Sequence, residues 1–522
     1  MAGIQEDLFE LIQTLSVTEK RYFKVFATNH KSDNINYLTL FDALCELDRY
    51  DEEKLVKKLE RKAKDKAKKD HRGQLNQDMH YLYKVLLQAI RQYNSKLKHI
   101  TIRDLTSDAI LLRDRGLLKQ AEKRIAKAKE IARKYFYHSA LLELNRLDRV
   151  LIWSLEDSDE IAKTNELIAE KDHILKILEE EMAYEDLYAQ VCNAIGYQAS
   201  FVKNEAQFEA IAQKISALFS QKEPDELSPN SRLRRYQTGI IHSMAERRFE
   251  DTNEFINQMF NWWESYDHLK EEEFFRYQFS LSGIITYLFN SNKPEEMMQL
   301  LLKIRERSTG IPNEQAMIFH FTINYELLYY LNTGKVHKAK DMLAEIEKGI
   351  QQYPLPIKKR ISIAYNAAMA CFFDEDYSYC ETWLLRIKMH ARNRFRKELI
   401  RMAFLLHVII LENQPDRQEK AILDAQKYFR KEKEAPGDEI ARKKNKQFEE
   451  EILRLISKIM HAPLNQSEKA QHAQALKDYL IMMRSEPSSS RLYGIDELLF
   501  WCESKLKQKS LRSVFTEGSL PV

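Results

Sequence analysis

The stretch Gly334-Lys335-Val336-His337-Lys338-Ala339 decides the fold of this chain, because it joins a turn residue to the start of a regular helix. Two positions after Gly334 begins a pattern of apolar or small residues at steps of three, four and three. Its members are Val336, Ala339, Leu343 and Ile346. These steps place all four side chains on one face of an α-helix. The stretch therefore predicts a short turn followed by an amphipathic helix.

The same pattern recurs along the chain at a nearly fixed distance. It begins at Leu118, Phe208, Phe249, Pro294, Val336, Tyr377 and Gln418. The steps between these residues are 90, 41, 45, 42, 41 and 41. Because the first step is twice 45, we expect one degenerate unit near Ile161 to Ile168. One amphipathic helix is common, but a fixed period is typical of a repeat architecture.

Two further features recur with the pattern. Two positions before it, four units have a turn-compatible residue: Gly116, Asn292, Gly334 and Asp416. Nine positions before it stands a small or apolar residue, which we interpret as the buried side of a preceding helix: Ala109, Ala199, Ile240, Ile285, Leu327, Ala368 or Ile409. Each unit is therefore predicted to be a helical hairpin. A hairpin must stack on its neighbour to bury its apolar face, so we expect about eight of them over residues 101–430.

These units resemble the tetratricopeptide repeat. Gly116-Leu117-Leu118-Lys119-Gln120-Ala121 and the stretch from Gly334 to Ala339 have its turn glycine and its small residue in the second helix. Glu375-Asp376-Tyr377-Ser378-Tyr379-Cys380 matches with Cys as the small residue. The resemblance covers residues 101–430 and implies a right-handed superhelix with a concave groove. The period is longer than the family's, which is about 34 residues, and longer helices explain the difference. A HEAT-like solenoid stays an alternative.

The composition agrees with a fold built from helices. The chain of 522 residues has only 12 Gly and 11 Pro, whereas sheet proteins need turns at every strand end. We therefore predict the all-α class, with an α-solenoid of stacked helical hairpins over residues 101–430. An N-terminal helical module is predicted over residues 1–100. C-terminal capping helices and a frayed tail are predicted over residues 431–522.

The two flanking regions show helical spacing without the repeat. In the N-terminal region, the capping box Ser16-Val17-Thr18-Glu19 opens one helix. The other helices of that region are predicted near 7–15, 37–47, 52–69 and 74–96. In the C-terminal region, helices are predicted near 439–460, 467–483 and 494–508. The polar segment 510–522 is predicted to be frayed.

The sequence contains no catalytic signature. No two glycines lie close enough for a phosphate-cradling loop, and no histidine pair has the spacing of a zinc hydrolase. The five cysteines are scattered and odd in number, as expected for reduced thiols. We therefore expect no enzymatic activity, no catalytic residue, no cofactor and no metal site.

The N-terminus and the apolar runs predict a soluble cytoplasmic protein with no membrane partner. The first residues lack the positive and apolar regions of a signal peptide. The most apolar run, residues 402–411, is about half as long as a membrane span. The net charge of +3 is too balanced to imply a polyanionic partner by itself.

Two basic segments keep nucleic acid as an alternative partner. Residues 54–72 contain ten Lys or Arg and three acids, and residues 386–401 contain seven Lys or Arg and one acid, Glu398. For residues 54–72, a solvated helix face is one interpretation, and contact with phosphates or with an acidic protein is the other. Phe395 can stack on a base or belong to the core. No nucleic-acid-binding motif accompanies either segment.

The leading functional prediction is a protein-interaction scaffold or adaptor that binds an extended peptide or a partner helix in its concave groove. Projecting the first helix of each unit gives candidate groove residues, which are otherwise packing residues between hairpins: Arg234, Gln237, Phe279, Thr286, Asn324, Leu328, Tyr365 and Met369. One alternative is a nucleic-acid- or ribosome-associated factor. The other is a peptide-responsive regulator, with residues 1–100 as effector and the solenoid as sensor.

Overall fold

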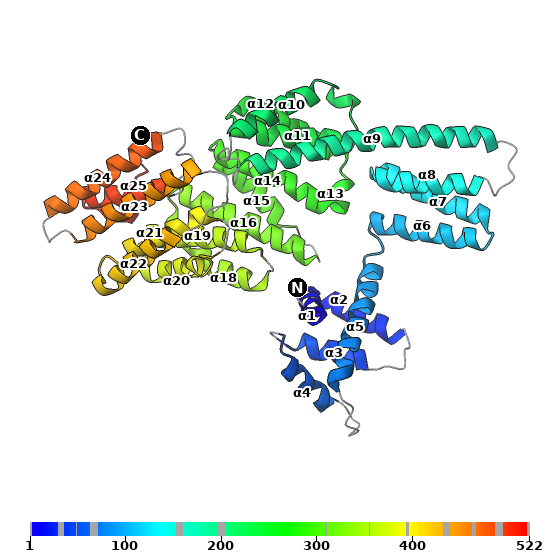
Figure 1. Cartoon of the computed structure of the whole chain (residues 1–522), viewed down its shortest axis with the longest axis horizontal. Coiled ribbons are helices and arrows are strands. Elements are labelled where there is room, and N and C mark those ends of the chain that lie inside the picture. Colours follow the sequence, from blue (N-terminus) through cyan, green and yellow to red (C-terminus); the bar gives the residue numbers. More distant parts are fainter. Residues whose placement is uncertain are drawn as a thin grey trace.

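The computed structural model (Figure 1) describes residues 3–29, 36–47, 50–62, 71–152, 160–195, 205–307, 311–353, 355–392, 396–431, 439–461, 466–485 and 494–518. These residues form α-helices joined by short turns, and none of them belongs to a β-strand. The predicted all-α class is therefore confirmed. In the described ranges, no helix combines the length and the apolar composition that a lipid bilayer requires of a spanning segment.

The N-terminal module folds around its own core. Its helices are α1 (Ile4–Thr14), α2 (Val17–Asn29), α3 (Asn36–Cys45), α4 (Glu52–Lys62) and α5 (His71–Tyr93). The predicted capping box is present, because the amide of Ser16 donates to Glu19 Oε2 at 2.8 Å and the amide of Glu19 donates to Ser16 Oγ at 3.2 Å. Leu8, Phe23, Phe41 and Leu82 meet in the core. The predicted end of the fourth helix, residues 63–69, lies outside the described residues.

The predicted hairpins follow from Lys98 onward. Their helix pairs are α6 (Lys98–Asp114) with α7 (Leu118–Lys134), α11 (Pro229–Ala245) with α12 (Phe249–Ser265), α14 (Phe274–Asn290) with α15 (Pro294–Arg305), α16 (Pro312–Asn332) with α17 (Val336–Asp341) and α18 (Leu343–Gln352), α19 (Ile357–Phe373) with α20 (Tyr377–Lys388), and α21 (Lys397–Ile410) with α22 (Pro415–Lys431). Five second helices begin at the first residue of the repeated pattern, namely Leu118, Phe249, Pro294, Val336 and Tyr377. The period therefore predicted these helix starts correctly.

The turns of these five hairpins share one backbone feature. The residue two positions before the second helix has a positive φ: Gly116 75°, Arg247 60°, Asn292 54°, Gly334 68° and Glu375 61°. Glycine adopts this left-handed conformation at little cost, whereas other residues pay a steric penalty in it. The fourth predicted turn residue, Asp416, instead lies in the first turn of α22, because that helix begins at Pro415.

A helix pair lies where the degenerate unit was expected near Ile161 to Ile168: α8 (His138–Ile152) packs against α9 (Glu160–Ala194), which begins one residue before Ile161. Ile161 and Ile168 are 81% and 41% exposed, so they do not form the buried face of this pair. The helix α9 is longer than the repeat predicts. No Gly or Pro occurs between Glu160 and Ala194, so nothing in the sequence ends the helix early. The next second helix, α10 (Glu205–Phe219), contains the repeated pattern that begins at Phe208 and packs against α9. The short elements η2 (Pro224–Glu226) and α13 (Leu269–Glu272) lie between hairpins. The predicted buried residue Ala199 lies outside the described residues.

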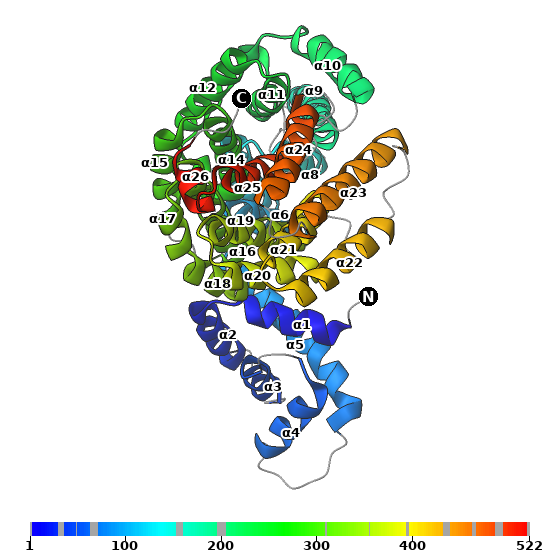
Figure 2. The same cartoon turned by 90° about the vertical axis from the view of Figure 1, so that its left-hand side faces the viewer.

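The first helices pack on one another in chain order. Contacts join α9 to α11, α11 to α14, α14 to α16, α16 to α19 and α19 to α21. Figure 2 shows the second helices α12, α15, α17, α20 and α22 on the outside of a curve and the first helices inside it. We call the side of the first helices that is turned away from their second helices the inner face.

The C-terminal helices follow the last hairpin. They are α23 (Glu439–His461), α24 (Gln466–Ser485), α25 (Ile495–Lys507) and α26 (Leu511–Thr516), and Figure 2 shows α25 and α26 inside the ring of second helices. The prediction of a frayed segment from residue 510 was wrong for α26. Leu511 and Val514 are buried, and the ring of Phe515 stacks on that of Phe373 with 3.8 Å between centroids. Apolar residues at positions 511, 514 and 515 have helical spacing, which is the signal that predicts this helix.

Candidate interaction surface

Three of the predicted groove residues come together on α11 and α14. Arg234 Nη1 donates to Gln237 Oε1 at 2.8 Å, and Gln237 Nε2 donates to Ser280 Oγ at 2.9 Å. Gln237 is buried, whereas Phe279 exposes 43% of its surface. Gln237 is therefore a packing residue between hairpins, and Phe279 is available for contact.

A residue of α9 completes this group. The guanidinium of Arg234 lies 4.6 Å from the ring centroid of Tyr188, and the Tyr188 and Phe279 rings are 6.3 Å apart in an edge contact. Because α9 and α14 flank α11, their aromatic rings meet on the inner face. We call Tyr188, Arg234 and Phe279 the aromatic cluster. Tyr188 was not predicted, because the first helix of the Phe208 unit was placed around Ala199 and groove residues were projected only from Arg234 onward.

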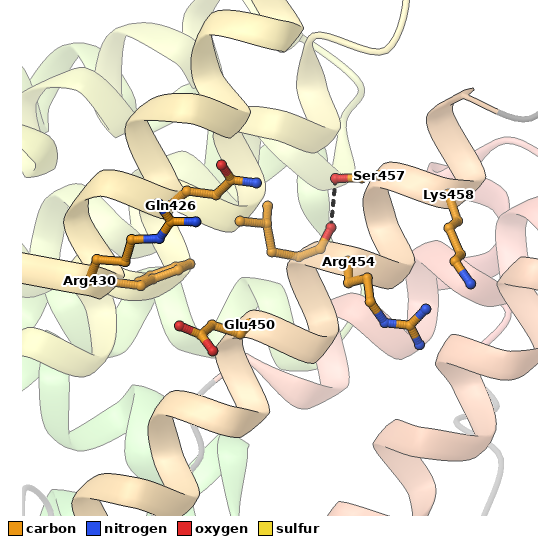
Figure 3. Close-up of a pocket in the computed structure, with 8 residues that line it drawn as sticks. Gln426, Arg430, Glu450, Arg454, Ser457 and Lys458 are labelled. Atoms are coloured by element: carbon orange, nitrogen blue, oxygen red, sulfur yellow. Dashed lines mark hydrogen bonds between the residues drawn. The ribbon is translucent and has the colours of Figure 1, made fainter.

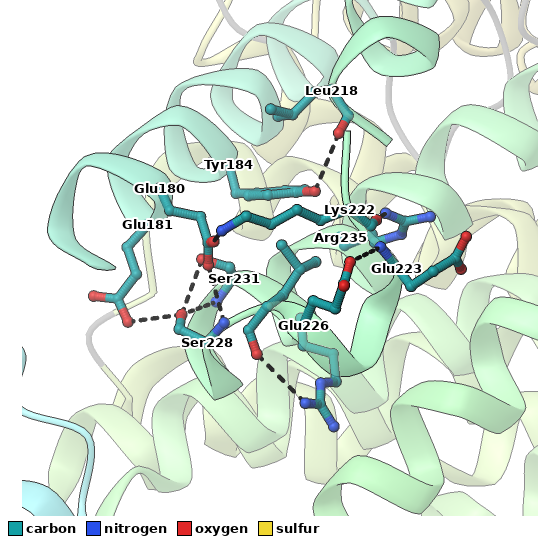
Figure 4. Close-up of polar contacts among 12 residues, drawn as sticks. Glu180, Glu181, Tyr184, Leu218, Lys222, Glu223, Glu226, Ser228, Ser231 and Arg235 are labelled. Carbon is teal, nitrogen blue, oxygen red and sulfur yellow. Dashed lines mark hydrogen bonds and ion pairs between the residues drawn. The ribbon is translucent and has the colours of Figure 1, made fainter. Parts of the chain in front are cut away.

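Polar contacts hold α9 against α11 beside the aromatic cluster (Figure 4). Glu180 accepts hydrogen bonds from the amide of Ser228 at 2.9 Å and from Lys222 Nζ at 2.5 Å. Ser228 also caps α11, since its Oγ accepts from the amide of Ser231 at 3.1 Å. Although burial raises the pKa of Glu180, the bonds from Lys222 and Ser228 bring it below its ordinary value. The network fixes the relative position of the two helices that carry Tyr188 and Arg234.

Of the other five candidates, Leu328 is half-buried and four are buried: Thr286, Asn324, Tyr365 and Met369. Asn324 is 1% exposed, and its Oδ1 accepts a hydrogen bond from Asn366 Nδ2 at 2.9 Å. Tyr365 is 3% exposed, and its hydroxyl donates to Glu497 Oε1 of α25 at 3.2 Å. Neither side chain is open to a partner in this structure, because neighbouring helices of the same chain cover them. Their buried positions agree with the packing interpretation given with the prediction.

The helix α25 covers this part of the inner face, and α26 packs beside it against the hairpin turns at Gly334 and Glu375. Phe373 of α19 meets Phe500 at 5.9 Å and Phe515 at 3.8 Å between ring centroids. Arg512 of α26 lies 3.1 Å from Asp374, which also binds Lys340 at 2.8 Å. Burial raises the pKa of Glu497 to about 7. The inner face therefore holds an amphipathic segment of its own chain.

A separate cavity of about 520 Å³ lies between α22 and α23 (Figure 3). It is lined by Gln426, Phe429, Arg430, Glu450, Leu453, Arg454, Ser457 and Lys458. Arg454 is held by Glu451, with 2.7 Å between Nε and Oε2. The lining combines three cations with one carboxylate.

Most described cations of the basic segment 386–401 have partners within the chain. Arg386 lies 2.6 Å from Glu347, and Arg401 lies 3.0 Å from Glu449. Lys388 Nζ lies 2.9 Å from His407 Nδ1, and Arg396 pairs with Glu398. Arg394 and Phe395 lie outside the described residues. The carboxylates in these pairs compete with phosphates for the same cations.

Only the beginning of the other basic segment, 54–72, is described with its side chains. Lys54 lies 3.5 Å from Asp51, and Lys58 lies 3.3 Å from Glu46. Both pairs are exposed and contribute little to stability. From residue 61 onward, the side chains of this segment lie outside the described part of the chain.

The described ranges contain no group of three His, Cys, Asp or Glu side chains that is arranged to hold a metal ion. Comparison with protein-family models, with curated proteins and with solved structures finds no match to this chain. The candidate site therefore rests on the geometry of the inner face.

Proposed function

We propose that this protein is a non-enzymatic interaction scaffold that binds a helix of a partner protein on its inner face. The supporting observation is that α25 of the same chain already lies against α19 there, through the contacts Tyr365–Glu497 and Phe373–Phe500. Trp501 of α25 is only 2% exposed. A surface that holds one amphipathic helix has the apolar pockets that another helix needs.

The aromatic cluster is the part of the inner face that we assign to the partner. Phe279 supplies an exposed apolar anchor, and Arg234 supplies a cation beside it. Aromatic residues and arginine carry most of the binding energy in protein interfaces. Arg234 is already oriented by Glu185 at 2.8 Å and by Gln237, so little side-chain entropy is lost on binding.

A nucleic-acid partner has less support from the described residues. Phosphate binding at residues 386–401 requires Arg386 and Arg401 to give up carboxylates that they already contact. Breaking such pairs offsets the gain from a new anion. The proposal therefore keeps a protein helix as the partner.

An affinity capture with matched variants tests the proposal. Phe279→Asp places a charge in the aromatic cluster, and Phe249→Asp makes the same change on the outer helix α12, where Phe249 is 45% exposed. We expect Phe279→Asp to lose the proteins that the wild type retains, and Phe249→Asp to keep them. Nuclease treatment of the lysate is expected to leave the captured proteins unchanged.

Two outcomes contradict the proposal. One is equal retention by wild type and by a folded Phe279→Asp variant, which removes the aromatic cluster from the interface. The other is loss of all partners after nuclease treatment together with a steep salt dependence, which indicates phosphate contacts. Circular dichroism of both variants establishes that they are folded.

A further inference from the structure

A regular row of apolar side chains lies exposed along α9. Ile161, Ile168, Leu175 and Met182 follow one another at steps of seven residues. Their exposed fractions are 81%, 41%, 43% and 65%. Isolated apolar residues are normal on protein surfaces, but four at a constant spacing on one helix are not scattered. We call these four residues the α9 stripe.

The spacing of the stripe matches one of the two apolar positions in a coiled-coil heptad, and the position three residues further along holds Thr164, Lys171, Leu178 and Glu185. Seven residues correspond to nearly two helical turns, so the four side chains lie on one face that drifts slowly around the helix. From Ile161 to Met182 the rise of about 1.5 Å per residue gives a length of about 32 Å. Ala162, Ala169 and Ala183 are exposed beside the stripe. These small residues leave room for another helix to approach closely.

The opposite side of α9 is already occupied by the chain itself. Ile174, Tyr184, Leu187 and Val191 are buried against neighbouring helices. Glu170 receives hydrogen bonds from Lys129 and Asn145, both at 2.7 Å. Figure 1 shows α9 running from the region of α11 out over α7 and α8. The helix is therefore fixed by one face and presents the stripe on the other.

The charges beside the stripe are mainly acidic. Asp172, Glu179 and Asp186 each stand four residues after a member of the stripe, which places them next to it on the helix surface. All three are exposed. Among the described residues, Glu179 and Asp186 have no ion-pair partner, and Asp172 contacts the adjacent Lys171 at 2.6 Å. Two cations also lie beside the stripe: Lys171, which stands between Ile168 and Leu175, and Lys176, which directly follows Leu175.

From this arrangement we infer that the α9 stripe is a second docking surface, which binds an amphipathic helix with basic flanks in a coiled-coil manner. The apolar side chains of that helix pack on Ile168 and Leu175. Its Lys or Arg residues meet the row of Asp172, Glu179 and Asp186. This surface is separate from the aromatic cluster of the inner face.

The acidic row argues against a second copy of the chain as the occupant. When α9 pairs with another α9 about a two-fold axis, both acidic rows flank the same seam. Like charges at such positions destabilise the pair. A partner with basic flanks converts the same positions into attractive contacts.

A pair of synthetic peptides provides a direct test. One is a helix of about four heptads with Leu at positions a and d and Lys at positions e and g, and the other has Glu in place of Lys. Repulsion between like charges keeps each peptide from pairing with itself. Binding to the full chain is measured by fluorescence anisotropy at physiological salt. We expect the Lys peptide to bind at least ten times more tightly than the Glu peptide.

Variants connect the binding to the stripe. The double variant Ile168→Gln with Leu175→Gln leaves the net charge and the helix unchanged. We expect it to weaken binding of the Lys peptide at least tenfold. Leu423→Gln is the control, because Leu423 is 59% exposed on α22. Changing Glu179 and Asp186 to Lys is expected to shift the preference toward the Glu peptide. Phe279→Asp is expected to leave peptide binding unchanged, which separates this surface from the inner face.

Three results overturn the inference. The first is equal affinity for both peptides, and the second is binding that the double Gln variant does not weaken. The third is a dimer in analytical ultracentrifugation that the double Gln variant dissociates, which makes a second copy the occupant. Each result counts only for variants whose circular-dichroism spectrum matches that of the wild type.

Discussion

The hydroxyl group of Tyr365 in α19 donates a hydrogen bond to Oε1 of Glu497 in α25, with 3.2 Å between the two oxygens, and joins residues 132 positions apart in the chain. This contact ties the C-terminal helices to the stack of hairpins. It also places a carboxyl group where burial raises its pKa from 4.5 to about 7, with the neighbouring Asp496 acting in the same direction. The attachment of α25 is therefore sensitive to pH.

The first prediction concerns this pH dependence. Because the pKa of Glu497 is higher in the folded state than in the unfolded state, the folded state binds more protons between about pH 4.5 and 7. The contribution of Glu497 to stability is thus largest below pH 4.5, falls as the pH rises to 7, and is constant above it. We expect faster amide exchange in α25 at pH 8 than at pH 5.5, after correction for intrinsic rates. Glu497→Gln should remove most of this difference, and an unchanged difference would refute the assignment.

The second prediction concerns the ion pairs that hold α9 on α7 and α8. The side chain of Lys129 is 7% exposed and lies 2.5 Å from Asp148 and 2.7 Å from Glu170. Lys129→Met leaves two partly buried carboxylates without their cation, which costs about 3–5 kcal/mol of the free energy of unfolding. Arg133→Met is the control, because Arg133 contacts the same Glu170 but is 58% exposed, and it should cost less than about 1 kcal/mol. Urea unfolding of both variants measures the difference, and similar losses would contradict the prediction.

The repeat period predicted local structure far better than it predicted long-range packing. It located the starts of α12, α17 and α20 at the correct residue. Each start depends on a turn and a helix face that residues close in the sequence encode. Arg247 and Glu375 were missed as left-handed turn residues because neither type is typical of a turn. Their position in the repeat identifies Arg247 and Glu375 as turn residues, because Gly116 and Gly334 occupy the same position in their own hairpins.

The candidate site was harder to predict, because it depends on which helices cover one another. Projection of the first helices correctly brought Arg234 and Gln237 together, and it placed Phe279 where it is exposed. It did not reveal that α25 covers Tyr365, since the contact with Glu497 spans most of the C-terminal region. Tyr188 was missed because α9 continues beyond the second helix of its own pair and also serves as the first helix before α10, from which no groove residue was projected. Hydrophobic spacing within one helix does not specify these long-range partners.

The third prediction concerns packing within a hairpin. Ala339 is completely buried in α17, at the small-residue position of the repeated pattern. Replacing it with Phe forces the neighbouring helices apart and costs about 1–3 kcal/mol of the free energy of unfolding. Each hairpin contacts mainly its neighbours, so amide exchange should increase chiefly in α16 and α19. Ala183→Phe introduces the same side chain at an exposed position of α9 and should leave stability nearly unchanged. Unchanged exchange in Ala339→Phe would show that the close helix contact lies elsewhere.

The last prediction uses the shared conformation of the hairpin turns. Arg247 adopts φ 60° at the place where Gly116 and Gly334 stand in their own hairpins. A residue with a Cβ atom is strained by about 1–2 kcal/mol in this conformation, and the greater freedom of glycine in the unfolded chain offsets about half of that. Arg247→Gly should therefore stabilise the protein by about 0.5–1 kcal/mol, measured as a higher urea midpoint. Gly116→Ala tests the same effect in reverse, because a Cβ atom at Gly116 would meet no other atom within 4 Å. Any loss in that variant comes from backbone strain and not from a clash, and it should amount to about 1 kcal/mol. If Arg247→Gly destabilises the protein while Gly116→Ala is neutral, the left-handed turn is not what ends the first helix of these hairpins.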